Sequence, residues 1–472
     1  MDFDLSGLLA EHVNDGYKLY GKYLNPQYPK VLHSIGFDTV YTRAEGAYLY
    51  DAAGNQYTDF LAGFGVFAAG RNHPVIRKAL QDALDLQLAE WTQFDCPPLT
   101  GLLAERLLAK APGLDRVFFC NSGTEAVESA LKFARYATGK RRVLYCDHAF
   151  HGLTTGSLAV NGSAEFRRGF DPLLPDTAIP LGDLDALVAE LRKGDVAALI
   201  IEPIQGKGVH LPPDGFLAAA ATLLHEHDAL LIVDEVQTGF GRTGDYFAYQ
   251  HEDVVPDIVT VAKALSGGYV PVGAMLAKDW IFQKVFSSME RMMVHSTTFK
   301  GGTLAMAAGL ASLHVIDDEH LAENAKRTGE ALQLALKQLA ERFDVLADVR
   351  GRGLMIGLEF DKPSSLRARA SWSVLQKMRV GMFSQLIVIA LYQRHRILTQ
   401  VSGDNVEIIK LIPPLMITDA DVKAFSEALG EVLEEASKGS GLNMDMAGTL
   451  AKLAGRSASA TFHLPRGRSS RR

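Results

Sequence analysis

The sequence predicts an α/β fold with a mostly parallel sheet sandwiched by helices, together with a smaller α+β domain. Between about residues 115 and 280, short apolar runs rich in β-branched and aromatic residues alternate with helical stretches. No internal repeat with a period of about 20 to 50 residues is apparent, which argues against solenoids and propellers. The flanks on either side contain alternating strands and further helices, which indicates a second unit.

Six runs of the central region are expected to be strands. They are RVFFC (116–120), RVLYC (142–146), AALIIEP (197–203), LLIVDE (230–235), DIVTVAK (257–263) and VGAMLA (272–277). In such sheets, ligands bind at the carboxyl ends of the strands. Polar residues that close these runs are therefore the first candidates for a functional site.

The large domain is predicted to span 65–318, and the small domain to combine 1–64 with 319–438. The first flank carries an expected helix and a β meander over 43–60. The second carries an expected helix over 320–343, an alternating strand over 353–360 and the apolar run VEIIKLIPPL. Residues 439–472 are small and polar and end in arginines, which is typical of a disordered, solvated tail.

Composition narrows the function. The 472 residues are 47% hydrophobic and 22% charged, which excludes a disordered chain. The net charge of −7 gives no general attraction to nucleic acid or anionic lipid, so the expected partners are small molecules.

The sequence also predicts a cytoplasmic location. Cys96, Cys120 and Cys146 form no CxxC pair and cannot all be paired within the chain, which favours a reducing compartment. The first residues lack a secretory pattern. The most apolar stretch, Met382 to Tyr392, is much shorter than the roughly 20 residues of a membrane span.

A phosphate site is predicted just after the expected strand 116–120. The strand ends at Cys120, and a helix with apolar residues at i, i+3, i+4 and i+7 begins near Thr124. The intervening turn, Ser122 and Gly123, offers unpaired N–H groups and hydroxyls at the positive end of a helix dipole. Ordinary helix capping by Ser122 or Thr124 is the alternative.

Two further strands end in residues with demanding chemistry. Asp234 closes an apolar run, and a buried carboxylate there requires a cation such as a protonated pyridine nitrogen, or backbone donors in the structural alternative. Lys263 lies two residues past a β-branched run. In an apolar cleft its amine would lose proton affinity and could form a Schiff base, whereas a surface lysine would do neither. Phosphate, pyridine nitrogen and aldehyde together describe pyridoxal phosphate.

Over roughly residues 35 to 435 the sequence resembles the class III, or ω-type, aminotransferases of the fold type I pyridoxal-phosphate enzymes. The matching segments are GAYLYDAAGNQYTDFLAGFGVFAAGRNHP (46–74), FFCNSGTEA (118–126), HAFHG (148–152), IIEPIQGKGV (200–209), DEVQTGFGRTG (234–244), PDIVTVAKALSGG (256–268), HSTTF (295–299) and RGRGLMIG (350–357). The resemblance implies a homodimer with shared active sites.

The resemblance also implies residue roles. Lys263 would form the Schiff base and transfer the proton, Asp234 would pair with the pyridinium nitrogen, and Gln237 would face the ring hydroxyl. The other cofactor contacts it implies are Ser122, Gly123 and Thr124 at the phosphate, Phe150 on the ring, Glu202 beside cofactor and substrate, and Thr298 at the phosphate of the partner's cofactor. No metal ligand is assigned.

Two tempting motifs are set aside. His151 follows Phe150, but a packing or hydrogen-bonding role is favoured over a catalytic one. The segment GFGRTG (239–244) matches G-x-G-x-x-G after a strand, yet the residues that follow do not form the crossover helix that a dinucleotide site needs.

The substrate side departs from the ornithine and γ-aminobutyrate enzymes of the class. Where these typically pair a Glu with an Arg that takes the glutamate carboxylate, this sequence has Lys207 and Lys410, which cannot form that gate. The phosphate-loop segment that is usually GGNPLA is KGGTLA (300–305), a change without a physical account. Both lysines are candidate substrate contacts.

The acceptor is expected to be a carbonyl compound, with a terminal aldehyde favoured. The segments YLNPQ (23–27), IGFD (35–38), FGVFAAGRNHP (64–74) and IQGKGV (204–209) resemble a bacterial branch that converts hopanoid side chains to aminobacteriohopanetriol. A bulky apolar acceptor lying over 364–402 is one interpretation of that segment, and a buried helix is the other. Alternative functions are a same-fold aminomutase, a decarboxylating transaminase and a non-catalytic pyridoxal-phosphate-binding protein.

Overall fold

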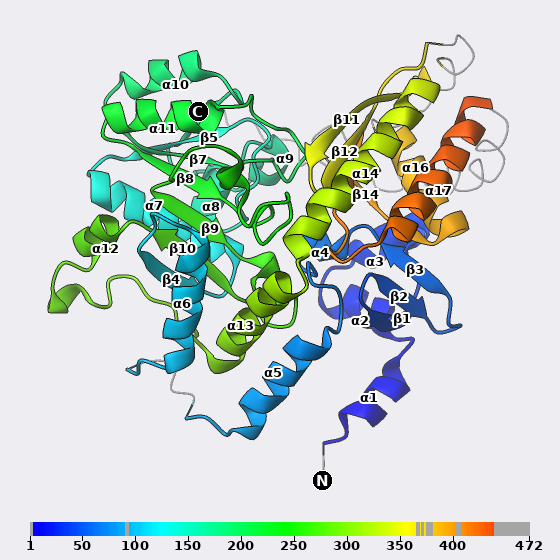
Figure 1. Cartoon of the computed structure of the whole chain (residues 1–472), viewed down its shortest axis with the longest axis horizontal. Coiled ribbons are helices and arrows are strands. Elements are labelled where there is room, and N and C mark those ends of the chain that lie inside the picture. The colour runs from blue at the N-terminus through cyan, green and yellow to red at the C-terminus, as the bar shows by residue number, and fades with distance from the viewer. Residues whose placement is uncertain are drawn as a thin grey trace, which may run out of the picture.

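The computed structural model describes residues 3–89, 94–364, 369, 372–373, 381–402 and 407–438. A seven-stranded sheet with its helices lies beside two four-stranded sheets with theirs (Figure 1). This arrangement confirms the predicted α/β class with additional α+β structure. The predicted tail, 439–472, lies outside the described residues, and the domain boundaries at 64/65 and 318/319 stay predictions.

The seven-stranded sheet is built from all six expected runs and one more strand. Its order is β4 (Arg116–Cys120), β10 (Gly273–Ala277), β9 (Ile258–Val261), β8 (Leu230–Asp234), β7 (Val196–Ile201), β5 (Arg142–Cys146) and β6 (Thr177–Ile179). β10 is antiparallel to both of its neighbours, and the other pairs are parallel. The additional strand, β6, is three residues long at the sheet edge, too short for a period-2 pattern to predict it.

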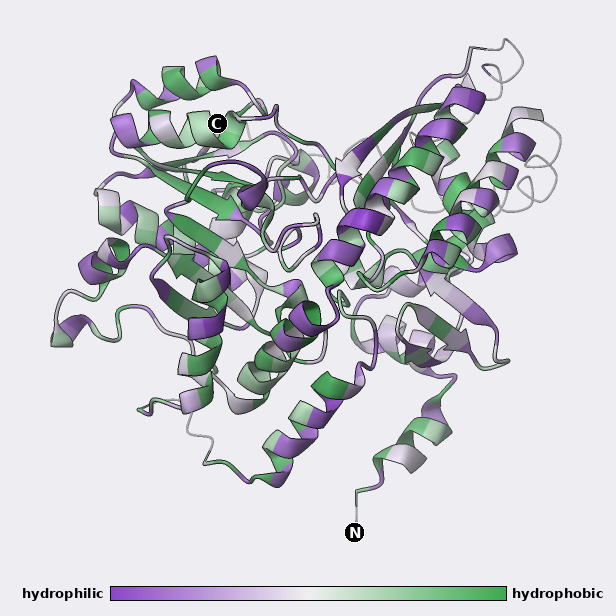
Figure 2. Cartoon of the chain, in the orientation of Figure 1, coloured by the Kyte–Doolittle hydropathy of each residue, from purple (hydrophilic) through white to green (hydrophobic). Residues whose placement is uncertain are grey.

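Both faces of this sheet are buried, which explains the continuous apolar runs. Leu231 and Val233 of β8 belong to one hydrophobic cluster, and Leu230 and Ile232 to another, because successive side chains point to opposite faces. One cluster is completed by α7 (Gly123–Thr138) and α12 (Asp279–Val285). The other is completed by α5 (Pro74–Asp85), α6 (Pro98–Lys110), α10 (Leu184–Leu191), α11 (Phe216–Glu226) and α13 (Thr303–Asp318). Figure 2 shows the central strands as mainly hydrophobic.

Strand pairing joins segments from the two ends of the chain. The meander consists of β1 (Tyr41–Glu45), β2 (Tyr48–Asp51) and β3 (Gln56–Asp59), and β3 pairs in parallel with β13 (Ile397–Leu398). A second sheet has the order β11 (Leu346–Arg352), β12 (Met355–Phe360), β15 (Ile408–Leu411) and β14 (Gln400–Ser402). β11 escaped prediction because its sequence, LADVRGR, is broken by glycine and arginine.

Helices cover these outer sheets. They are α14 (Leu321–Arg342), α16 (Met382–His395) and α17 (Asp419–Lys438), with α1 (Leu5–His12), α2 (Gly16–Tyr23) and α3 (Tyr28–Ile35) preceding the meander where one helix was expected. α16 is buried along most of its length, as a core helix would be. Shorter helices are α4 (Ala62–Gly65), α8 (Thr155–Ala159) and α9 (Ala164–Arg167).

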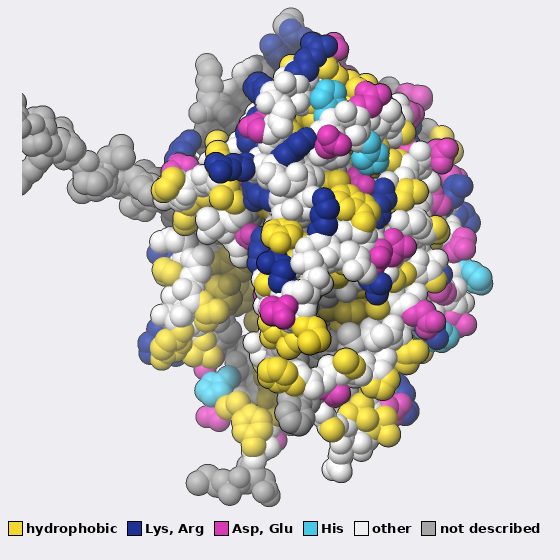
Figure 3. Space-filling model, turned by 90° about the vertical axis from the view of Figure 1, so that its left-hand side faces the viewer, with side chains coloured by type: hydrophobic (Ala, Val, Ile, Leu, Met, Phe, Trp, Pro, Cys, Tyr) yellow, Lys and Arg dark blue, Asp and Glu magenta, His cyan; other side chains and the backbone are white. Residues whose placement is uncertain are grey.

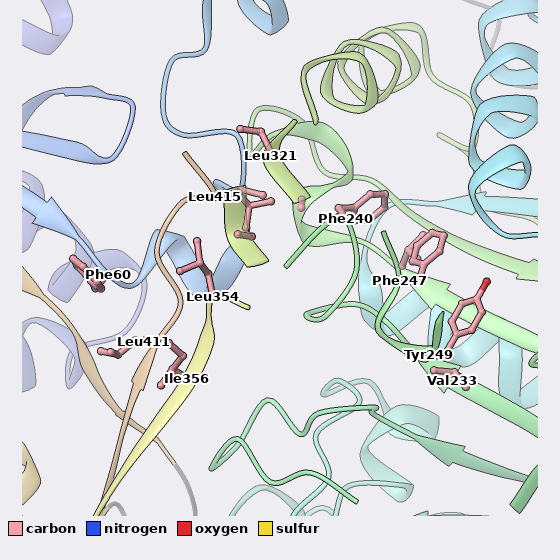
Figure 4. Packing of buried hydrophobic residues seen from close by; sticks show 14 of the residues in the cluster. Phe60, Val233, Phe240, Phe247, Tyr249, Leu321, Leu354, Ile356, Leu411 and Leu415 are labelled. Carbon is pink, nitrogen blue, oxygen red and sulfur yellow. The ribbon is translucent and has the colours of Figure 1, made fainter. Parts of the chain in front are cut away.

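A single hydrophobic cluster connects the two parts. It runs from Val233, Phe240 and Phe247 on the seven-stranded side to Leu354 and Phe60 on the other (Figure 4). The parts are therefore held together by shared apolar burial, which is the main favourable term in folding.

The surface matches the modest net charge. On the face shown in Figure 3, acidic and basic side chains are interspersed with hydrophobic ones rather than gathered into an area of one sign. Among the helices in the described part of the chain, none is both long and apolar enough to cross a bilayer.

The contact between α14 and the β11–β12 turn requires a glycine at position 329. A Cβ built there would lie 2.1 Å from the carbonyl oxygen of Gly353, which is backbone and cannot swing away. We expect Gly329→Ala to lower the melting temperature, although alanine is the better helix former. Gly21→Ala in α2 is the matched control, because its Cβ would meet only a Pro29 side-chain atom at 3.6 Å. Equal melting temperatures for the two variants would contradict this packing.

Candidate active site

A cavity of about 960 Å³ lies at the carboxyl ends of the central strands. Residues from the seven-stranded sheet, from the segment before α5 and from β14 and β15 form its wall. Most of the sequence-predicted site residues line it: Ser122, Gly123, Thr124, Phe150, Glu202, Lys207, Asp234, Gln237, Lys263 and Lys410. Thr298 is the predicted residue that is not among the described lining residues.

Asp234 ends β8 and is 3% exposed. Its Oδ1 accepts hydrogen bonds from the Val236 N–H and the Thr260 hydroxyl, each at 3.0 Å, and its Oδ2 lies 2.7 Å from His151 Nδ1. Thr260 reaches the carboxylate because β8 and β9 pair in a register that sets Asp234 opposite it. Both oxygens are thus held, so the carboxylate has a fixed orientation in the cavity wall.

His151 is a hydrogen-bonding histidine, as the sequence indicated. Burial lowers the pKa of its imidazole, but the hydrogen bond to Asp234 and the charge of that carboxylate outweigh burial, so the pKa is raised. Its Nε2 is buried without a hydrogen-bond partner in the described structure. The histidine therefore contacts the carboxylate through Nδ1.

Lys263 lines the cavity and is separated from the end of β9 by one residue, Ala262. Burial lowers the pKa of its amine, and the charges of Asp234 and Glu202 oppose that effect only in part. Its backbone has φ of 36°, a region that residues other than glycine seldom occupy and that is concentrated at functional sites. Because its pKa is lowered, the amine is a better nucleophile near neutral pH than the amine of a surface lysine.

The start of α7 forms an anion-binding end of the cavity. Ser122 caps the helix by accepting the Glu125 N–H at 3.3 Å, which leaves the amides of Gly123 and Thr124 without intrahelical acceptors. A Cβ on Gly123 would lie 2.9 Å from the Val236 side chain, so the close packing of the helix start against Val236 requires glycine. Backbone N–H groups and the helix dipole therefore face the cavity together.

Neighbouring side chains hold this end of the cavity in place. The Thr124 hydroxyl lies 2.8 Å from that of Thr154 and 2.7 Å from that of Ser157. Glu128 accepts from the Thr154 hydroxyl and from the amides of Gly156 and Ser157. Glu128 carries no signal in the sequence, since only tertiary structure brings α7 and α8 together.

Glu202 and Phe150 connect two loops at the cavity. One carboxylate oxygen of Glu202 accepts the Phe150 N–H at 3.0 Å, and the other accepts the Gly206 N–H at 2.8 Å. Burial raises the pKa of Glu202. The Phe150 ring lies edge-on to Phe166, with ring centroids 5.3 Å apart.

Lys207 and Lys410 both lie at the cavity, but in different settings. Lys207 Nζ lies 4.6 Å from the centre of the Phe166 ring and 3.9 Å from a carboxylate oxygen of Glu165. Lys410 is 3% exposed and donates to the Gly206 carbonyl at 2.7 Å and to Gln237 Oε1 at 3.1 Å. Burial, reinforced by the charge of Lys263, lowers the pKa of Lys410 to about 7.

His295 and Thr297 anchor the loop 295–300 to α7 and to the residues just before it. His295 Nε2 lies 2.8 Å from the Ser129 hydroxyl, and the Lys132 amine lies 2.9 Å from Nδ1. Asn121 donates to the Thr297 hydroxyl at 3.0 Å. Burial, together with nearby lysines, lowers the pKa of His295 to about 4, so it is neutral near pH 7.

The GFGRTG segment has a structural role. Arg242 is buried, and its guanidinium donates to the main-chain carbonyls of Pro413 and Leu354. Gly241 and Gly244 lie against Ala322 and Lys326 of α14. The segment thus joins the seven-stranded part to the C-terminal segments, in line with the argument against a dinucleotide site.

The residues around the cavity fit pyridoxal phosphate. The α7 amides suit its phosphate, the oriented Asp234 carboxylate suits a protonated ring nitrogen, and the Lys263 amine suits its aldehyde.

Comparison with known proteins then decides the family. The family model "Aminotransferase class-III" matches residues 33–433. The chain belongs to the class III aminotransferase family. Its cofactor is therefore pyridoxal phosphate, and the family agrees with the resemblance derived from the motifs.

The relatives differ in name and length. Aminotransferase PigE from a Serratia species is 36% identical over an alignment of 452 residues that covers 89% of this chain and 53% of PigE. The chain therefore spans about half the length of this curated relative. An ornithine aminotransferase structure from Toxoplasma gondii has a TM-score of 0.81 at 28% identity, covering 93% of this chain and 99% of that one. The structure of an amine transaminase from an uncultivated Pseudomonas species, with pyridoxal phosphate bound, has a TM-score of 0.72 at 30% identity. The match covers 84% of this chain and 95% of that one.

Proposed function

We propose that this class III aminotransferase moves an amino group from an amino-acid or amine donor to a carbonyl acceptor, through a Schiff base on Lys263. The observation that carries the proposal is that Lys263, Asp234 and the start of α7 line one cavity. We further propose that the reaction takes place in the cytoplasm, within a homodimer. Thr298 of each subunit would then reach the phosphate of the partner's cofactor.

The cofactor residues divide by the part of pyridoxal phosphate that each would hold. The phosphate would lie on Ser122, Gly123 and Thr124, the ring against Phe150, and the ring hydroxyl near Gln237. Glu202 would keep Phe150 in position, because its carboxylate holds the Phe150 amide. When bound, the cofactor supplies an electrophilic carbon and an electron-accepting ring.

Lys263 and Asp234 would carry the chemistry of the protein itself. The amine of Lys263, with its lowered pKa, can take a proton from a substrate carbon at Nζ and return it elsewhere, as a general base and acid. The carboxylate of Asp234 would keep the ring nitrogen protonated. Its three hydrogen bonds fix its orientation before the reaction, so no reorganisation is required when charge develops.

The acceptor we propose has a terminal aldehyde on an apolar body, of which a hopanoid aldehyde is one example. Apolar side chains from several segments support this, since the lining includes Phe64, Val66, Phe166, Val270 and Val401. Of the segment 364–402, the described lining residues include Gln400, Val401 and Ser402 but none from α16, so only the end of that segment supports an acceptor lying over it. Lys207, beside Phe166, is the proposed polar contact for substrate.

Replacing Lys263 tests the covalent attachment. We expect Lys263→Ala to fold, to lose the visible absorption of the imine and to lose turnover, because the variant lacks the amine that would bond to the cofactor aldehyde. The exposed lysine Lys337→Ala is a control that should retain both. Absorption spectra and mass spectrometry after borohydride reduction are the measurements, and a cofactor adduct in Lys263→Ala would refute the assignment.

Replacing Asp234 tests the charge partner. Asp234→Asn keeps the shape and most hydrogen bonds but removes the charge, so we expect proton abstraction to slow by about 10²–10³-fold, with weaker cofactor binding in Asp234→Ala. Single-turnover absorbance with a donor amine measures the rate. A rate in Asp234→Asn equal to that of the unchanged protein would remove Asp234 from this role.

A ¹⁵N-labelled donor separates transfer from the alternatives. We expect label from an external amine to appear in the product of an aldehyde acceptor, with the donor converted to a ketone or aldehyde. Release of carbon dioxide from the donor would indicate a decarboxylating enzyme instead. Product nitrogen derived only from the acceptor molecule would indicate an aminomutase, and no conversion with any amine would indicate a binding protein.

A further inference from the structure

Gln237 is bound at both ends of its amide group. Its Nε2 donates to the main-chain carbonyl of Phe64 at 3.0 Å, and its Oε1 accepts from Lys410 at 3.1 Å. A main-chain carbonyl accepts hydrogen bonds and cannot donate them, so the NH₂ end of the amide must face Phe64. The amide can therefore satisfy both neighbours in one orientation only, with its oxygen toward Lys410.

This orientation leaves one amide hydrogen of Gln237 available. The NH₂ group has two donors, and the Phe64 carbonyl takes one of them. Gln237 also lines the cavity, so the second donor is available to a group bound there. If the amide were reversed, its oxygen would face the Phe64 carbonyl at hydrogen-bond distance, which is repulsive.

Lys410 already donates hydrogen bonds to two protein groups. Of its three possible donors, one goes to Gln237 and one to the Gly206 carbonyl, so at most one remains for a substrate. It therefore cannot supply the two parallel bonds with which a guanidinium binds a carboxylate. The charged groups that act on it are Lys263, Glu202 and Arg242, of which only Glu202 is acidic.

The backbone at Gly206 completes the contact. A Cβ at this position would lie 2.7 Å from Gln237 Oε1 and 3.1 Å from Glu202 Oε1. The loop can approach the amide closely only because residue 206 has no side chain. Gly206 and Lys410 thus confine the oxygen of Gln237 from two sides, using segments that are about two hundred residues apart in the chain.

We propose that Lys410 is a positioning residue that fixes the Gln237 amide, so that Gln237 presents an N–H donor to the cofactor side of the cavity. The inference rests on the proposed function in one respect, namely that Gln237 faces the ring hydroxyl of the cofactor. In this proposal Lys410 orients Gln237 for its contact with the cofactor and does not bind a substrate carboxylate through two hydrogen bonds.

A double-mutant cycle tests this coupling. The holoenzyme is compared with Lys410→Met, Gln237→Ala and the double variant, using the absorption maximum of bound cofactor and its pH midpoint. We expect Lys410→Met to shift the spectrum in the direction of Gln237→Ala, and the double variant to match Gln237→Ala alone. Thermal melting of each apoprotein shows that the variants fold.

Matched variants separate positioning from substrate contact. Lys207→Met removes another cavity lysine, whose amine lies beside Phe166 and Glu165, so it should raise KM for substrate without moving the spectrum. Lys410→Arg keeps hydrogen-bond donors and should restore the spectrum in part. Gly206→Ala should displace the amide oxygen and reproduce the shift of Lys410→Met while keeping the lysine.

The possible failures are distinct. If Gln237→Ala leaves the spectrum unchanged, the proposed contact between Gln237 and the cofactor is wrong and the inference falls with it. If Gln237→Ala shifts the spectrum but Lys410→Met does not, or if the two shifts add in the double variant, then Lys410 does not act through Gln237. A change in KM alone for Lys410→Met would likewise overturn the inference and make Lys410 a substrate contact.

Discussion

The active site depends on one carboxylate that is kept in a fixed orientation away from water. Asp234 stands at the end of a strand that is buried on both faces, and it accepts hydrogen bonds from a backbone amide, a threonine of the next strand and a histidine. A buried charge is costly without partners, and these partners make its position stable. The neighbouring strand carries Lys263 on its extension, so the register of β8 and β9 also sets how the amine and the carboxylate face one cavity.

Site residues could be predicted from the sequence where a polar or charged residue ends a buried, apolar strand. Asp234 and Lys263 stood out because each ends an apolar run, and Ser122 and Gly123 because they join a strand to an amphipathic helix. All four line the cavity. The functional roles assigned to them are still predictions, whereas the family and the fold class agree with the comparison and the structure.

Other features lay beyond the reach of local patterns. Thr260 meets Asp234 through strand register, and Glu128 meets the α8 amides through helix packing, neither of which a single sequence specifies. His295 offered a weaker signal, since it stands in a family motif three residues before Thr298, but its anchoring to Ser129 is tertiary. The approach of Lys410 to Gln237 spans 173 positions and depends on the outer sheet lying against the central one.

The main chain and the side chain of Phe64 have separate contacts at the site. Its carbonyl holds Gln237, while its side chain is 51% exposed and borders the cavity. Its backbone has φ of 63°, which glycine or asparagine adopts more readily than phenylalanine does. An engineer seeking to admit larger acceptors could therefore replace this residue with glycine or asparagine, which would shorten the side chain and relieve backbone strain while the main-chain carbonyl still holds Gln237.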